Sequence, residues 1–107
     1  MSENENVEVN ANGSFITPQM AAHAATLWNS KNPEDGVAYA AMSEKMLRKV
    51  ESLYATLSPP RKDVVVNKHQ QILSGIPIRV DKFIPKGEIH MRAKDHRVVA
   101  KIVGLEE

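Results

Sequence analysis

Apolar positions divide the first half of the chain into two predicted helices. The first begins at Thr17 and Pro18, because a hydroxyl side chain caps a helix well and proline suits its first turn. Its apolar face carries Met20, Ala24 and Leu27, with Trp28 at the edge. A second start at Asn32-Pro33 and a stop at Ser58-Pro59-Pro60 predict a long helix that ends at Leu57.

The predicted second helix is amphipathic. Its apolar stripe consists of Tyr39, Met42, Met46, Val50, Leu53 and Leu57. One interpretation is that this stripe covers the sheet formed by the second half of the chain. The alternative is a helix interface with a partner, formed by Met42, Met46, Val50, Leu53 and Leu57, because their spacing is close to a heptad repeat.

The second half of the chain alternates in the manner of strands. Val64–Val66 is a β-branched run, and Ile76–Val80 resumes the pattern after Gly75. Between them, Asn67 and Gln70 resemble a capping box, which predicts a short helix over Lys68–Leu73. The expected fold is therefore α+β, with two N-terminal helices packed on a small, mostly antiparallel C-terminal sheet and one short intervening helix.

The last two strands have a predicted register. If the chain turns at Asp95-His96, then Ala93 faces Val98, Met91 faces Ala100 and Ile89 faces Ile102, so the apolar side chains share one face. The opposite face then becomes basic, with Glu88 as its one acid. This predicted basic face consists of Arg79, His90, Arg92, Lys94, Arg97 and Lys101.

Residues 1–14 are predicted to form an extended or flexible arm, followed by a single domain over residues 15–107. The arm is acidic and carries few apolar side chains, so it cannot fold alone. Val7 and Val9 alternate with Glu8, which suits a strand added to a sheet edge of another chain or of a distant part of this one. Glu3, Glu5 and Glu8 are candidates for pairing with the basic face.

Composition excludes several chemistries. The chain of 107 residues has no cysteine, so disulfides, thiolate metal sites and a cysteine nucleophile are ruled out. The four histidines lack the spacing of zinc or metalloprotease motifs, and no glycine-rich phosphate loop is present. We therefore expect no enzyme activity, no catalytic residue, no metal and no cofactor. A net charge of +1 neither favours nor opposes a polyanionic partner, and no apolar run is long enough to cross a membrane.

One stretch carries a family resemblance. Gly75-Ile76-Pro77-Ile78, preceded by a strand and small helix and followed by the turn Pro85-Lys86-Gly87, resembles part of the capsid-protein fold of tailed phages. The resemblance covers about a third of the chain and implies a small virion or accessory protein, found in the virion or the host cytoplasm.

Three functions follow as hypotheses. The first is a structural or interaction protein in a larger assembly, with other protein subunits as partners in a homo-oligomer or hetero-assembly. The second is a nucleic-acid-binding module that uses the basic face, although no aromatic residue alternates with its charges. The third is a small inhibitor that binds a host protein.

Overall fold

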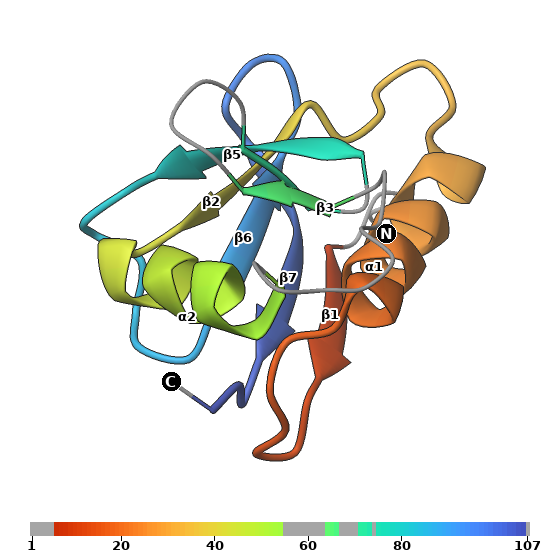
Figure 1. Ribbon diagram of the computed structural model, residues 1–107. Helices are drawn as coiled ribbons and strands as arrows, with labels where there is room; N and C mark the ends of the chain where they lie inside the picture. Colours follow the sequence, from red (N-terminus) through yellow and green to blue (C-terminus); the bar gives the residue numbers. More distant parts are fainter. Residues whose placement is uncertain (1–5, 55–63, 67–70, 74, 107) are drawn as a thin grey trace.

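Over the residues that the structure describes, the fold is a sheet with two helices. The computed structural model describes residues 6–54, 64–66, 71–73 and 75–106, and Figure 1 shows their arrangement. In chain order the elements are β1 (Val7–Asn10), α1 (Pro18–Lys31), β2 (Tyr39–Met42), α2 (Glu44–Tyr54), β3 (Val64–Val66), β4 (Gln71–Leu73), β5 (Ile76–Val80), β6 (Ile89–Arg92) and β7 (Val98–Val103).

The strands lie in the order β1-β7-β6-β2-β5-β4-β3. Strands β1, β7, β6, β2 and β5 form a mixed sheet, because β1 pairs with β7 and β2 pairs with β5 in parallel while the other pairs are antiparallel. Strands β4 and β3 continue it beyond β5. Both parallel pairs join strands that are distant in sequence, as parallel pairing requires.

The predicted arrangement of helices and sheet is therefore wrong, although the fold is broadly α+β. Two strands, β1 and β2, come from the N-terminal half of the chain, and β2 separates the two helices. The sheet is mixed, with two parallel pairs, and it is not formed by the C-terminal half alone. The sequence pattern of the second half alone did not reveal that its strands need partners from the first half.

The long second helix is the largest error. Asn32 ends α1, where its backbone N–H donates to the carbonyl oxygens of Trp28 and Asn29. Tyr39–Met42 is strand β2, fully buried between β5 and β6. Pairing on both sides outweighs the helix preference of its alanines, which is a common tertiary override of local propensity. Helix α2 begins only at Glu44, after Ser43 accepts a hydrogen bond from the backbone N–H of Met46 at 3.1 Å.

The predicted apolar stripe is consequently divided between two elements. Met46, Leu47 and Val50 are buried on α2 and share one core cluster with the sheet, so this part of the stripe covers the chain's own sheet. Tyr39 and Met42 belong to β2. Leu57 lies outside the described residues, as does the side chain of Leu53.

The short helix predicted over Lys68–Leu73 is also wrong in the part that the structure describes. Gln71–Leu73 is strand β4, paired with β3 and β5, and residues 68–70 lie outside the described part of the chain. Gly75 has the positive φ of 77° expected of it, but it turns the chain from β4 into β5 and does not end a helix.

The β6–β7 hairpin follows the predicted register over most of its length. Ile89 pairs with Ile102 and Met91 pairs with Ala100, and all four side chains are fully buried. A bulge between Met91 and Arg92 then shifts the pairing, so Arg92 lies opposite Val98. The predicted pairing of Ala93 with Val98 is therefore wrong, because the bulge inserts one extra residue into β7.

Both helices belong to a single apolar cluster on one face of the sheet. Trp28 of α1 and Met46 of α2 are both within it, together with Ala40, Met42 and Ile78 from the strands. Side chains alternate along β2, so Tyr39 and Ala41 point to the other face, where they form a separate small cluster with Ile84. We call this the outer face.

Candidate interaction site

A pocket of about 440 Å³ opens on the outer face. It is lined by Tyr39 and Ala41 from β2, Arg79 and Val80 from β5, Arg92 from β6 and the loop Asp81–Phe83. The three strands are neighbours in the sheet, so the pocket lies over the centre of the outer face and extends to the loop that follows β5.

The loop beside the pocket has a fixed backbone. The backbone N–H of Asp81 donates to the carbonyl oxygen of Met42 at 2.8 Å, which ties the loop to the end of β2. The Asp81 carboxylate accepts a hydrogen bond from the backbone N–H of Phe83 at 2.9 Å, forming an Asx turn. Ile84 is buried against Tyr39 and Ala41. These contacts hold the loop at both ends.

Phe83 lies at the exposed part of this loop. Its side chain is 82% exposed, more than the other large apolar side chains of the described residues, and the next two are Val80 and Phe15 at 50% and 46%. The Lys82 ammonium lies 5.4 Å from the centre of the Phe83 ring. The loop therefore has a backbone fixed by hydrogen bonds, and it exposes an aromatic ring to solvent next to the pocket.

Asp81 and Arg92 form a partly buried ion pair beneath the loop. Arg92 Nη2 donates to Asp81 Oδ2 at 2.9 Å, and both side chains are 22% exposed. The hydrogen bond from the Phe83 backbone lowers the pKa of the Asp81 carboxyl; burial opposes this, and Arg92 lowers it further. The neighbouring Tyr39 hydroxyl and then Asp81 raise the pKa of Arg92, against the effect of burial. Both groups are charged at neutral pH, and they pair with each other.

Tyr39 forms part of the floor of the pocket. Its ring is 7% exposed, its hydroxyl shares a hydrogen bond with His96 Nδ1 at 2.8 Å, and the Arg79 guanidinium lies 4.7 Å from the ring centre. Such a distance is typical of a cation–π contact. Arg79 is itself exposed, and none of the described carboxylates pairs with it. It is therefore a positioned cation at the pocket's edge.

The predicted basic face is not one open cationic surface. His90 is buried and its Nε2 donates to Glu88 at 2.8 Å, and Arg92 pairs with Asp81. Arg79 is exposed at the pocket, Lys94 is exposed and Lys101 is half-buried. Neighbouring carboxylates thus neutralise part of the predicted charge.

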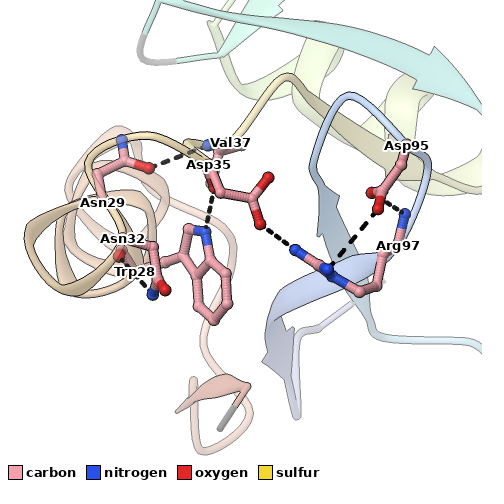
Figure 2. Close-up of polar contacts among 7 residues, drawn as sticks. All are labelled: Trp28, Asn29, Asn32, Asp35, Val37, Asp95 and Arg97. Carbon is pink, nitrogen blue, oxygen red and sulfur yellow. Dashed lines mark hydrogen bonds and ion pairs between the residues drawn. The ribbon is translucent and has the colours of Figure 1, made fainter. Parts of the chain in front are cut away.

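Arg97 belongs to a different polar cluster, shown in Figure 2. Its guanidinium pairs with Asp35 and, at 3.7 Å, with Asp95 of its own turn. The indole Nε1 of Trp28 donates to the carbonyl oxygen of Asp35 at 2.7 Å, and Asn29 Oδ1 accepts from the backbone N–H of Val37 at 3.0 Å. Arg97 therefore helps to join the loop after α1 to the β6–β7 turn.

The predicted arm contributes a strand to the chain's own sheet. Strand β1 pairs in parallel with β7, with Val7 opposite Ala100 and Val9 opposite Ile102. Val7 is buried, Val9 is half-buried and Glu8 is exposed. Of the two predicted acceptors, the distant part of the same chain is the one observed. Glu3 and Glu5 lie outside the described residues, and binding of the arm to a partner stays a prediction.

Sequence reasoning missed the residues that form the pocket, apart from Arg79 and Arg92. A signal for Phe83 was present, because a large apolar residue between Asp81-Lys82 and Pro85 is unusual for a solvated turn. Tyr39 was not recognised because the sequence analysis assigned it to the predicted second helix. Among the described residues, no group of three or more His, Asp or Glu side chains is placed to hold a metal ion, and no helix is long and apolar enough to cross a membrane.

Comparison of the chain with protein-family models, with curated proteins and with solved structures gave no match. Evidence on function therefore comes from the pocket and its surrounding side chains.

Proposed function

We propose that this chain is a non-enzymatic interaction protein that binds another protein within a larger assembly. The binding surface consists of Tyr39, Arg79, Val80, Lys82 and Phe83, which we call the Phe83 surface. A phage virion is the setting that the resemblance at residues 75–78 and 85–87 implies. The single observation that carries the proposal is the exposure of Phe83 on a loop whose backbone is held in place.

Energetic considerations support a binding role for Phe83. Burial of a phenyl ring in an interface contributes roughly 1.5–3 kcal/mol, which is lost while the ring faces water. Aromatic and arginine side chains are enriched among the residues that dominate interface energies, and both types adjoin the pocket here. Because the Asp81 contacts already hold the loop, its ordering adds little to the cost of binding.

Nucleic-acid binding is the second candidate, and one observation favours it. The fold places the aromatic residues Tyr39 and Phe83 beside Arg79 and Lys82, which the sequence pattern of the hairpin did not suggest. Single-stranded nucleic acids, however, stack on successive exposed rings. Tyr39 is buried and covered by Arg79, so Phe83 alone offers an open ring on this surface. A protein partner therefore fits the geometry better.

A photo-crosslinking experiment tests the proposal. The photoreactive amino acid p-benzoylphenylalanine is incorporated at Phe83, and at Phe15 in a matched control, because Phe15 is also an exposed phenylalanine. After irradiation in cell extracts or virus particles that contain the protein, we expect one defined protein adduct from position 83 and none from position 15. Equal labelling from both positions would contradict the proposal.

The identity of the adduct separates the remaining alternatives. A virion or assembly subunit supports the first hypothesis, and a host enzyme supports the inhibitor hypothesis, since both use a protein-binding surface. A nucleic-acid adduct at position 83 would replace the proposal with the second candidate. The substitution Phe83→Ser should retain the wild-type circular dichroism spectrum, because a substitution at an exposed site usually changes stability by no more than about 0.5 kcal/mol.

A further inference from the structure

We infer that the Phe83 surface recognises an acidic protein segment, in which an apolar side chain enters the pocket and a neighbouring Asp or Glu carboxylate binds Arg79. Lys82 adds a second positive charge on the same side. This inference rests on the proposed function and specifies the chemistry of the partner.

The charges around the pocket are unbalanced. Among the described residues, three cationic side chains line it, Arg79, Lys82 and Arg92, against the single carboxylate of Asp81. That carboxylate is occupied by Arg92 and by the backbone N–H of Phe83. Among the described residues, Arg79 and Lys82 have no carboxylate partner, so a bound segment with acidic side chains would complement the surface.

Arg79 is positioned for carboxylate binding. Its guanidinium carbon lies 4.7 Å from the centre of the Tyr39 ring, which is a cation–π distance, and the group is exposed to solvent. Tyr39 is in turn fixed by burial and by the hydrogen bond to His96. Guanidinium groups bind carboxylates through two parallel hydrogen bonds, and prior positioning reduces the entropy lost on binding.

The pocket itself suits an apolar side chain. Its floor is formed by buried Ala41 and Tyr39, and Phe83 exposes apolar surface at its edge. Together with Arg79, this produces an apolar site beside a cation. An extended segment presents alternate side chains to such a surface, so a carboxylate next to, or two residues from, an apolar residue is within reach of Arg79.

A phosphate backbone is a poorer match. A nucleic acid requires several free cations along its path, but the arginines at positions 92 and 97 are paired with carboxylates and His90 is bonded to Glu88. Of the cations on the predicted basic face and the loop after β5, Arg79 and Lys82 adjoin the apolar pocket without a carboxylate partner among the described residues. A short acidic segment therefore fits the charge distribution better than a long polyanion.

A peptide selection tests this inference. Random short peptides displayed on yeast are selected on the purified full chain, and clones that still bind the Phe83→Ser variant are removed. We expect enrichment of sequences that carry Asp or Glu close to a large apolar residue. The affinity of a selected, fluorescein-labelled peptide is then measured by fluorescence anisotropy.

The role of Arg79 is measured with matched variants. Arg79→Gln should weaken binding roughly tenfold, as the loss of a charge-assisted hydrogen bond implies, and Arg79→Glu should weaken it more. Lys94→Glu is the control, because Lys94 is also exposed but does not line the pocket, and it should change affinity less than about threefold, the effect of a distant rim charge. A peptide in which Gln replaces the acidic residue should bind the unmodified chain and Arg79→Gln with the same affinity, because the carboxylate that Arg79 would bind is absent.

The outcomes separate the inference from the proposed function. Phe83-dependent peptides without acidic residues, or unchanged affinity in Arg79→Glu, would overturn the acidic chemistry and leave the protein-binding surface standing. Absence of any Phe83-dependent peptide would overturn both. If labelled oligo(dT) binds more tightly than the selected peptides and its binding depends on Phe83, the surface is assigned to nucleic acid. If the chain self-associates and Phe83→Ser abolishes this, the surface is assigned to a second copy. Either result refutes the inference.

Discussion

Replacement of Trp28 by phenylalanine should destabilise the protein more strongly than removal of the ion pair beside it. Trp28 is 1% exposed, and its indole Nε1 donates to the Asp35 carbonyl oxygen at 2.7 Å (Figure 2). Phenylalanine keeps a ring in the core but removes the donor and part of the buried surface. The loop after α1 would then lose its hydrogen bond to the buried indole.

The expected loss follows from these contacts. About three buried ring atoms are removed, at roughly 0.8 kcal/mol each, and the unpaired carbonyl adds about 1–3 kcal/mol. The free energy of unfolding should therefore fall by about 3–5 kcal/mol. By contrast, the Arg97–Asp35 ion pair is 53% and 42% exposed, and such pairs contribute only about 0–1 kcal/mol.

Urea unfolding followed by far-ultraviolet circular dichroism measures both losses. Fluorescence is unsuitable because Trp28 is the only tryptophan. The control is Asp35→Asn, which removes the charge of the ion pair and keeps the backbone carbonyl. A loss below about 1 kcal/mol in Trp28→Phe, or an equal loss in Asp35→Asn, would refute the conclusion that the indole contributes more than the ion pair to holding this loop.

Three further predictions concern other parts of the fold. Gly87→Ala should lower the thermal midpoint in calorimetry, because φ is +75° and the new Cβ would lie 2.8 Å from the Leu105 carbonyl oxygen; an unchanged midpoint would contradict this. The pKa of Asp81 is lowered from 3.8, so its ionised form stabilises the folded state above that pH, and this stabilisation is lost as acid titrates the folded carboxyl. Asp81→Asn should therefore reduce the acid dependence of stability in urea titrations at several pH values, and an identical pH profile would refute this. Deletion of residues 1–12 removes β1 and exposes β7, so a lower melting temperature is expected by circular dichroism; wild-type melting would show that β1 contributes little.

The sequence predicted those parts of the fold that local contacts determine. Thr17 caps α1 as expected, with its Oγ1 accepting from the Met20 backbone at 3.1 Å, and the alternation of apolar residues was enough to pair Met91 with Ala100. In both cases the information lies within a few residues or within one hairpin. Such patterns have a direct physical reading.

The parts that sequence analysis misplaced depend on distant partners. The segment Tyr39–Met42 contains two alanines and resembles a helix, and only burial between β5 and β6 makes it a strand. Sequence analysis missed the pocket for the same reason, since Tyr39 and Phe83 line it together only when β2 lies beside β5. Arg79 and Arg92 were recognised as cations, but their different environments follow from Asp81, which no local spacing connects to Arg92.

The pairing of β1 with β7 has a consequence for synthesis of the protein. Val7 leaves the ribosome long before Ala100, its partner across the parallel ladder. Strand β1 therefore waits without its native neighbour while nearly all of the intervening chain is translated, and the sheet can be completed only after β7 has emerged. Contacts of such sequence separation slow folding. The exposed Glu8 places a charge within the waiting strand, and charge on an unpaired strand discourages association with other nascent chains.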